Sequence, residues 1–368
     1  MFRNHLTLSL LWYKGKKVKK VEENRDFPWD VLDIISKTLD FDDLFQFAGV
    51  CKNWRAFRKI YWRNFLASQE PLILQISYYG NGSISLSSIP EQKVYCLKMM
   101  EYFFRYTYVT SCSGYFIMAG YNNSFMLINP FTRINKVINT SNIEVQSYMF
   151  ANHALLAFGK CSEEFVLVVL CQDSMSLHVY QSRNCGWVTY STMENQGRVV
   201  DFVIFHNIIY VVTDKANIGV LSLNSANIKF LKLKSIPDAT TSLCLRLVNC
   251  DDQLLVVDLK FDFIRNAYKI DFSTMNYVEL ETLGDIALFY VSNMLEKNCY
   301  ALRNPNMWGY ESNSVYVISF LSTTCIMYSW DDKRSQKYIT LPNPCGTGFS
   351  MFDWCFRHLR HEVDYSLV

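Results

Sequence analysis

The stretch 27-FPWDVLDIISKTLDFDDLFQFAGVCKNWR-55 carries apolar residues at helical spacing. Pro28 can open a first helix, because a proline in the first turn loses no helical hydrogen bond. Apolar side chains then recur at Val31, Leu32, Ile35 and Leu39. Two more helical segments are expected, around residues 44–51 and 54–61. Three helices this short bury little apolar area among themselves, so the unit is expected to bury one face against a partner.

From Leu72 onward the pattern becomes that of strands. Runs rich in Val, Ile, Phe and Tyr alternate with turns, and no long amphipathic helix is evident between residues 110 and 340, which disfavours a parallel α/β fold. Strong strands begin near five residues, namely Tyr115, Phe165, Ile208, Leu254 and Val315. Their spacing of roughly 45 to 60 residues is that of four-stranded propeller blades. The sequence therefore predicts an all-β propeller of six or seven degenerate blades, with a pair of β-sandwiches as the structural alternative.

These patterns predict a multidomain α+β chain in three parts. Residues 1–25 form a basic leader, residues 26–70 the helical unit, and residues 71–368 the propeller-like domain. The lysines between positions 14 and 20 of the leader are compatible with a nuclear address. A solvated, disordered tail is the favoured interpretation of that segment.

The composition argues against several classes of protein. Half of the 368 residues are hydrophobic, and 36 basic residues against 34 acidic ones leave a net charge of only +2. A nucleic-acid-binding domain usually has a basic face, so no nucleic-acid partner is expected. The 12 cysteines occur singly, without a Cys-x-x-Cys pair, and no secretory signal precedes them. The apolar runs are too short to span a bilayer, so we expect no membrane association and a location in the nucleus, the cytoplasm or both.

Signatures of an enzyme are missing from the sequence. It has no phosphate-binding loop, nucleophile elbow or metalloprotease motif, and its carboxylate pairs are expected to be solvated in turns. Near the C-terminus, Cys355, His358 and His361 are three residues apart, with Asp353 close by. They could hold a metal ion from one helical face. An amphipathic closing segment, with Phe349, Phe352 and Phe356 turned inward, is the favoured interpretation. We therefore expect no catalytic residue, no metal and no cofactor.

The stretch 27–55 resembles the F-box, a family whose motif begins with Leu-Pro and ends in Val-Cys-Lys-x-Trp-Arg. Residues 50–55 read Val-Cys-Lys-Asn-Trp-Arg, while Phe27 replaces the usual leucine before Pro28. The resemblance implies binding to the Skp-type adaptor and, through it, to a cullin scaffold. It implies eight adaptor-binding residues, which are Phe27, Pro28, Val31, Leu32, Ile35, Val50, Cys51 and Trp54.

The rest of the chain resembles plant F-box proteins whose C-terminal part is a degenerate propeller, formerly a domain of unknown function. Residues 113–116, 127–133, 201–210 and 283–289 carry much of that similarity. Together the resemblances imply a substrate-recognition subunit of a Skp-cullin-F-box (SCF) ubiquitin ligase, without catalysis of its own. Two alternatives remain open, a propeller that binds a small ligand or carbohydrate beside a vestigial F-box, and a propeller hydrolase.

A target protein is expected to bind the loops of the propeller, because its strands are used in blade packing. The segment 298–312 is expected to be a loop that carries three anchors of a protein interface, Arg303, Trp308 and Tyr310. In the alternative, Trp308 only fills the space between two blades.

Overall fold

The computed structural model describes residues 27–38, 47, 50–57, 71–77, 84–97, 106–120, 124–129, 134–140, 151–160, 162–171, 176–192, 194–235, 237, 245–260, 263–292, 298–319, 324–342, 350–356 and 361–366. It divides the chain into two compact units, residues 1–62 and 63–368. The leader, the expected second helix apart from Phe47, Val50 and Cys51, and His358 lie outside the described residues.

The helical unit contains α1 (Trp29–Thr38). Pro28 precedes the helix, and its carbonyl oxygen accepts hydrogen bonds from the N–H groups of Val31 and Leu32. Residues 52–57 are also helical. The described part of this unit is thus helical, as predicted, while the predicted number of helices stays a prediction.

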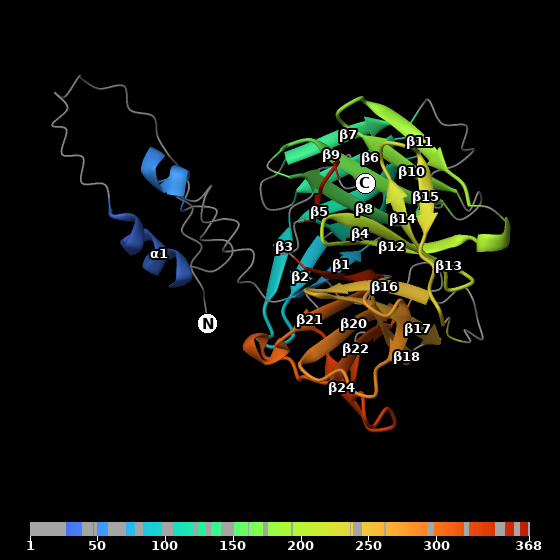
Figure 1. The fold of residues 1–368 in the computed structure, drawn as a ribbon. Coiled ribbons are helices and arrows are strands. Elements are labelled where there is room, and N and C mark those ends of the chain that lie inside the picture. Colours follow the sequence, from blue (N-terminus) through green and yellow to red (C-terminus); the bar gives the residue numbers. More distant parts are fainter. Residues whose placement is uncertain are drawn as a thin grey trace, which may run out of the picture. The chain divides into compact units, whose positions relative to one another are not determined.

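The second unit is a six-bladed β-propeller, each blade a separate sheet (Figure 1). Blade 1 contains β25 (Ser350–Cys355), β1 (Leu72–Ser77), β2 (Ile84–Ser87) and β3 (Val94–Leu97). Blade 2 contains β4 (Tyr106–Cys112), β5 (Tyr115–Gly120), β6 (Ser124–Asn129) and β7 (Ile134–Asn139). Blade 3 contains β8 (Ala151–Gly159), β9 (Phe165–Cys171), β10 (Leu177–Gln181), β11 (Gly186–Tyr190) and β26 (Glu362–Val363).

The other three blades complete the ring. Blade 4 contains β12 (Val199–Phe205), β13 (Ile208–Thr213), β14 (Ile218–Ser222) and β15 (Asn227–Phe230), and the 3₁₀ turn η3 (Glu194–Gln196) precedes it. Blade 5 contains β16 (Leu245–Cys250), β17 (Gln253–Lys260), β18 (Phe263–Asp271) and β19 (Asn276–Glu279). Blade 6 contains β20 (Ile286–Ser292), β21 (Cys299–Arg303), β22 (Ser314–Ser319), β23 (Thr324–Ser329) and β24 (Gln336–Thr340), with η5 (Pro305–Trp308) between β21 and β22.

The innermost strands stand side by side around the axis. β25 contacts β4, β4 contacts β8, β8 contacts β12, β12 contacts β16, and β16 contacts β21. Figure 1 shows β4, β8, β12 and β16 near the middle of the propeller and β7, β11 and β24 at its outside. The second strands are covered by neighbouring blades on both faces, so all seven residues of β9 are buried. Continuous apolar runs are expected for strands buried on both faces.

The ring is closed in blade 1, where the late strand β25 pairs antiparallel with β1 from Leu72↔Cys355 to Ser77↔Ser350. The helical spacing of Phe349, Phe352 and Phe356 predicts an amphipathic helical face here, with these three rings turned inward. That expectation is wrong because residues 350–355 form a strand. Phe352 and Phe356 are nevertheless buried.

Blade 6 departs from the regular order. β21 lies at its inner edge, antiparallel to β20, and β20 runs parallel to β22. The segment 298–312, expected to be a loop, is therefore an inner strand followed by η5. Gly309 ends η5 with a φ of 77°, and a Cβ there would lie 2.9 Å from the Cβ of Pro90, so this tight turn requires glycine.

Candidate functional site

The predicted adaptor-binding residues of the helical unit differ in exposure. Phe27 is 50% exposed and Val50 62%, whereas Leu32 is fully buried. Pro28 is also exposed. The remaining four are partly buried, namely Val31, Ile35, Cys51 and Trp54. Leu32 thus lies in the interior in this structure and supports the surface from below, while Phe27, Pro28 and Val50 are directly accessible.

Aromatic packing orders this surface. The rings of Phe47 and Trp54 lie 4.3 Å apart, and Phe27 meets Trp54 edge-on at 6.2 Å. Asn53 Nδ2 donates to the carbonyl oxygen of Phe27 at 3.4 Å, so the start of α1 is tied to residues 52–57. Trp54 N–H donates to Cys51 Sγ at 3.5 Å, within the motif 50–55. The two ends of the F-box-like motif are therefore in contact.

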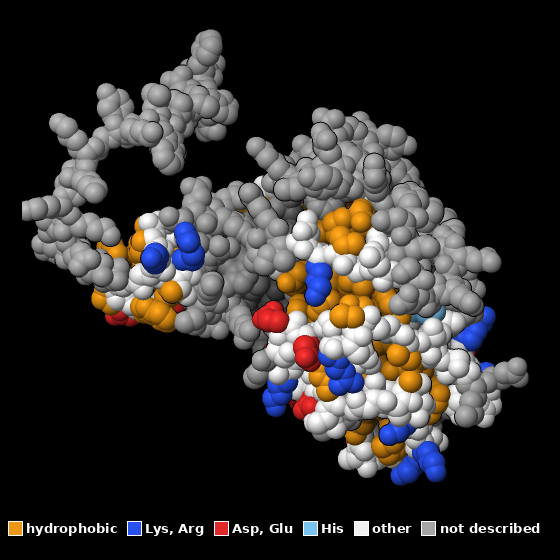
Figure 2. Space-filling model, turned by 90° about the horizontal axis from the view of Figure 1, so that it is seen from above, with side chains coloured by type: hydrophobic (Ala, Val, Ile, Leu, Met, Phe, Trp, Pro, Cys, Tyr) orange, Lys and Arg blue, Asp and Glu red, His pale blue; other side chains and the backbone are white. Residues whose placement is uncertain are grey.

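Two further apolar side chains of α1 are exposed and were missed by the sequence analysis. Trp29 is 47% exposed and Ile34 is 65% exposed. Both residues lie outside the apolar stripe of α1. That stripe was the sequence signal from which the adaptor-binding residues of the helix were predicted. Hydrophobic side chains are visible on the surface of the helical unit, at the left of Figure 2. A concentration of exposed apolar groups on so small a unit is typical of a protein-binding surface.

The propeller contains a cavity of about 380 Å³ among its innermost strands. Residues of β4, β8, β12, β16 and β21 line it, as does His361 beside β26. The volume falls in the range of ligand sites in proteins. We call it the axial cavity.

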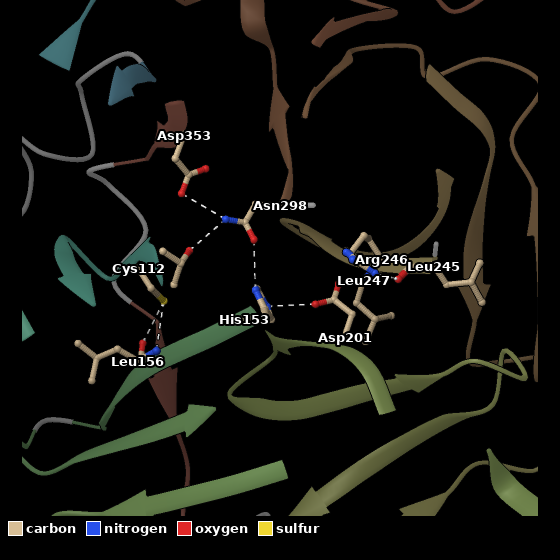
Figure 3. Close-up of polar contacts among 10 residues, drawn as sticks. Cys112, His153, Leu156, Asp201, Leu245, Arg246, Leu247, Asn298 and Asp353 are labelled. Carbon is tan, nitrogen blue, oxygen red and sulfur yellow. Dashed lines mark hydrogen bonds and ion pairs between the residues drawn. The ribbon is translucent and has the colours of Figure 1, made fainter. Parts of the chain in front are cut away.

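A chain of polar contacts runs through the wall of the axial cavity (Figure 3). His153 lies between two partners, with Nε2 3.1 Å from Asp201 Oδ1 and Nδ1 3.2 Å from Asn298 Oδ1. Asn298 Nδ2 donates to Thr110 Oγ1 at 3.3 Å and to Asp353 Oδ2 at 3.2 Å. The network connects blades 3, 4, 2 and 1 through the residue that precedes β21.

The hydrogen-bond donors and acceptors of this network indicate which of its atoms carry hydrogens. A carboxylate only accepts, so the amide of Asn298 turns its Nδ2 to Asp353 and its Oδ1 to His153. His153 Nδ1 must then carry a hydrogen. Its Nε2 faces Asp201, whose Oδ2 already accepts the Leu247 N–H at 2.7 Å. The 3.1 Å contact between His153 Nε2 and Asp201 Oδ1 extends the network to blade 4.

Burial shifts the pKa values of other titratable groups in and near the axial cavity. Loss of solvent raises the pKa of Asp353 to about 6, although Tyr108 OH donates to it at 2.6 Å. Burial also raises the pKa of Cys112 to about 11 and that of Cys250 to about 12, and it raises the pKa of Cys299 further. Thiols with such pKa values are poor nucleophiles. The axial cavity is equipped for polar binding rather than for cysteine chemistry.

The three predicted target-binding residues lie in different surroundings. Tyr310 is buried, and its OH donates to the carbonyl oxygen of Pro71 at 3.0 Å. This ring belongs to the core and is not accessible to a target. Trp308 is partly buried and packs on the same apolar cluster. Arg303 forms ion pairs with Asp252 at 3.0 Å and Asp285 at 2.8 Å on the surface.

The proposed metal ligands of the C-terminal segment do not form a cluster among the residues that the structure describes. No group of three His, Cys, Asp or Glu side chains suited to a metal ion is present within that part of the chain. Asp353 instead accepts hydrogen bonds from Tyr108 and Asn298. In the same described part, no helix is both long and apolar enough to cross a membrane.

A helical unit with an F-box-like motif and a six-bladed ring define the class of F-box propeller proteins. The family model described as "F-box domain" matches residues 25–57, and the model described as "KIB1-4 beta-propeller" matches residues 86–343. The chain belongs to the KIB1-4 beta-propeller family. A search of curated proteins finds no match to it.

Three solved structures illustrate the wider similarity. The crystal structure of Citrobacter koseri AztD shares 12% identity over 62% of this chain and 61% of that chain, with a TM-score of 0.36. The apo form of Citrobacter koseri AztD shares 10% identity over 62% of each chain, with a TM-score of 0.34. A Bacteroides thetaiotaomicron protein of unknown function shares 12% identity over 58% of this chain and 51% of that chain, with a TM-score of 0.31. The chain thus spans about three fifths of the length of the AztD structures.

Proposed function

We propose that this protein is the substrate-recognition subunit of an SCF-type ubiquitin ligase. The helical unit binds a Skp-type adaptor, which holds the cullin scaffold, and the propeller binds the target protein. The observation that carries the proposal is the match of residues 25–57 to the F-box, with Phe27 and Val50 of that segment exposed. Large apolar side chains at a surface stabilise a complex when a partner removes them from water.

The proposed mechanism needs no catalytic group on this chain. Holding a target next to a charged ubiquitin-conjugating enzyme raises the effective concentration of the two reactants. The raised pKa values of the cavity thiols agree with a binding role. On this proposal the protein works in the nucleus, the cytoplasm or both.

A second candidate function is the binding of a small polar ligand or carbohydrate by the propeller, with a vestigial F-box. The axial cavity and its His153–Asn298 hydrogen bond favour this candidate. The two functions differ in the role of the helical unit, because only the first requires the adaptor.

Affinity capture of the full-length chain, with the proteasome blocked, tests the proposal. We compare the wild type with the double variant Ile34→Asp/Val50→Asp, which places two charges on exposed positions of the helical unit. The wild type should retain adaptor, cullin and target, and the variant should retain the target alone. Equal recovery of adaptor by both chains would contradict the proposed function.

A further inference from the structure

Residues 361–366, which we call the strap, add a short strand to the inner edge of blade 3. β26 runs parallel to the end of β8, with Glu362↔Phe158 and Val363↔Gly159 in register. The N–H of Phe158 donates to the carbonyl oxygen of His361 at 3.0 Å. The red β26 lies among the green strands of blade 3 in Figure 1. The strap therefore occupies an edge of β8 that faces the axis.

The strap also binds the two blades beside blade 3. Towards blade 2, the N–H of His361 donates to Ser113 Oγ at 3.1 Å. Towards blade 4, the N–H of Asp364 donates to the carbonyl oxygen of Asn207 at 3.0 Å. The strap thus joins three consecutive blades, whereas β25 closes the ring in blade 1.

Side chains fasten the strap. Val363 is fully buried in the apolar cluster between blades 3 and 4. The guanidinium of Arg183 lies 4.4 Å above the ring of Tyr365, and Asn224 Nδ2 donates to the carbonyl oxygen of Tyr365 at 3.0 Å. A Cβ on Gly159 would lie 3.0 Å from the Tyr365 ring, so glycine allows the ring to approach β8. These are specific contacts, made by a short segment.

The strap stands at the wall of the axial cavity. His361 lines the cavity together with Cys112. Cys112 Sγ accepts the N–H of Leu156 at 3.3 Å, and the neighbouring Ser113 Oγ donates to the carbonyl oxygen of Leu156 at 2.6 Å. Because Ser113 Oγ also accepts the strap's His361 N–H, the strap is two hydrogen bonds away from the backbone that holds Cys112.

We propose that residues 361–366 are a releasable strap that controls access to the axial cavity between blades 2 and 3. A short edge segment opens at lower free energy than a whole blade, because fewer contacts are broken. Release removes His361 from the cavity wall and so widens the access of a reagent to Cys112, which is partly buried and lines the same cavity. This inference rests on the contacts of the strap and is independent of adaptor binding.

The test is the rate at which a small maleimide labels each cysteine of the full-length chain, read by mass spectrometry. Val363→Asp places a charge in the cluster that holds the strap, and Val278→Asp, at an exposed position of β19, is the matched control. Local release should raise the labelling rate of Cys112 about tenfold in Val363→Asp. The rate at the buried Cys171 and Cys325 should stay at the wild-type value, and Val278→Asp should change none of the three.

Either of two results with Val363→Asp would overturn the proposal. An unchanged rate at Cys112 means that the strap does not control access. A matching rise at Cys171 and Cys325 means that the strap is an integral part of the core and that its loss loosens the whole propeller. If Val363→Asp does not fold, Tyr365→Ala decides, since it removes the ring that packs beside Gly159 and under Arg183 without placing a charge in the cluster. That variant should raise the Cys112 rate by a smaller factor, and no rise would equally overturn the proposal.

Discussion

The helical unit and the propeller place their large apolar side chains in opposite ways. In the helical unit, Ile34 and Val50 are more than half exposed. In the propeller, Phe289 and Trp354 are fully buried, with their rings 4.8 Å apart between blades 6 and 1. The propeller buries most of its large apolar side chains between blades, because closure of the ring gives every blade two neighbours, and exposed ones such as Tyr338 lie on outer strands. The small helical unit leaves several of its large apolar side chains exposed.

The largest expected effect is on the propeller core. Phe289→Ala should lower the free energy of unfolding by about 3–5 kcal/mol, because it leaves a cavity among the rings of Tyr310, Tyr316 and Trp354. Tyr338→Ala, at a position of β24 that is 67% exposed, should change it by less than about 0.5 kcal/mol. Chemical denaturation measures both. Similar losses in the two variants would show that blade 6 is not packed as described.

The buried carboxyl of Asp353 should make propeller stability depend on pH. Its pKa of about 6 in the folded state lies above the usual value of 3.8, so folding favours the protonated form. This contribution is complete below about pH 4 and is lost as the pH rises through 6, a change of about 3 kcal/mol for a shift of two pKa units.

Comparison with Asp353→Asn isolates this contribution from that of other carboxyl groups. The stability of the wild type relative to the variant should fall between pH 4 and pH 7 and then stay constant. Urea denaturation at a series of pH values measures it. A constant difference across that range, or one that grows with pH, would count against the burial of an ionisable Asp353.

A smaller effect on stability is expected at the partly buried Trp308 of blade 6 than at its buried residues. Trp308 is only partly buried, so Trp308→Ala should cost about 1–2 kcal/mol of stability, and Tyr310→Ala should cost more. If Trp308 and Arg303 bind the target, as the sequence predicts, Trp308→Ala also weakens target capture while the chain stays folded. Thermal melting together with target capture measures both properties. A large loss of stability with Trp308→Ala would place this ring in the core instead.

The smallest effect on stability is expected in the helical unit. Ile34→Asp changes a side chain that is 65% exposed, so the free energy of unfolding should change by less than about 0.5 kcal/mol. Leu32→Ala, at a buried position of the same helix, is the matched control and should reduce helix content. Circular dichroism of the full-length chains distinguishes the two. Equal losses of helix would mean that the exposed face of α1 is also structural.

The propeller was predictable from its second strands and not from its inner ones. The run 165–170 is continuously apolar because neighbouring blades cover both faces of β9. The inner strands mix apolar residues with polar ones that face the cavity, such as His153 and Asp201, and they lack such a signal. β25 was misassigned because Phe349, Phe352 and Phe356 follow one another at helical spacing, whereas pairing with β1 makes the segment a strand.

The two candidate sites also differ in how far they can be predicted from the sequence. The F-box motif is contiguous, so eight adaptor-binding residues can be proposed from the sequence, and they stay a prediction. Thr110, His153, Asp201, Asn298 and Asp353 each come from a different part of the chain. Only closure of the ring brings them together, so no local pattern could predict their network.

The most direct test of the account is a calorimetric titration of a Skp-type adaptor into the full-length chain. Val50→Asp changes an exposed valine of the helical unit, and Val137→Asp changes a valine of β7 that is 52% exposed on the propeller. We expect Val50→Asp to weaken adaptor binding by at least about 2 kcal/mol, as for an interface anchor, and Val137→Asp to leave it unchanged. Wild-type affinity in Val50→Asp, or no binding of the adaptor by the wild type, would contradict the account.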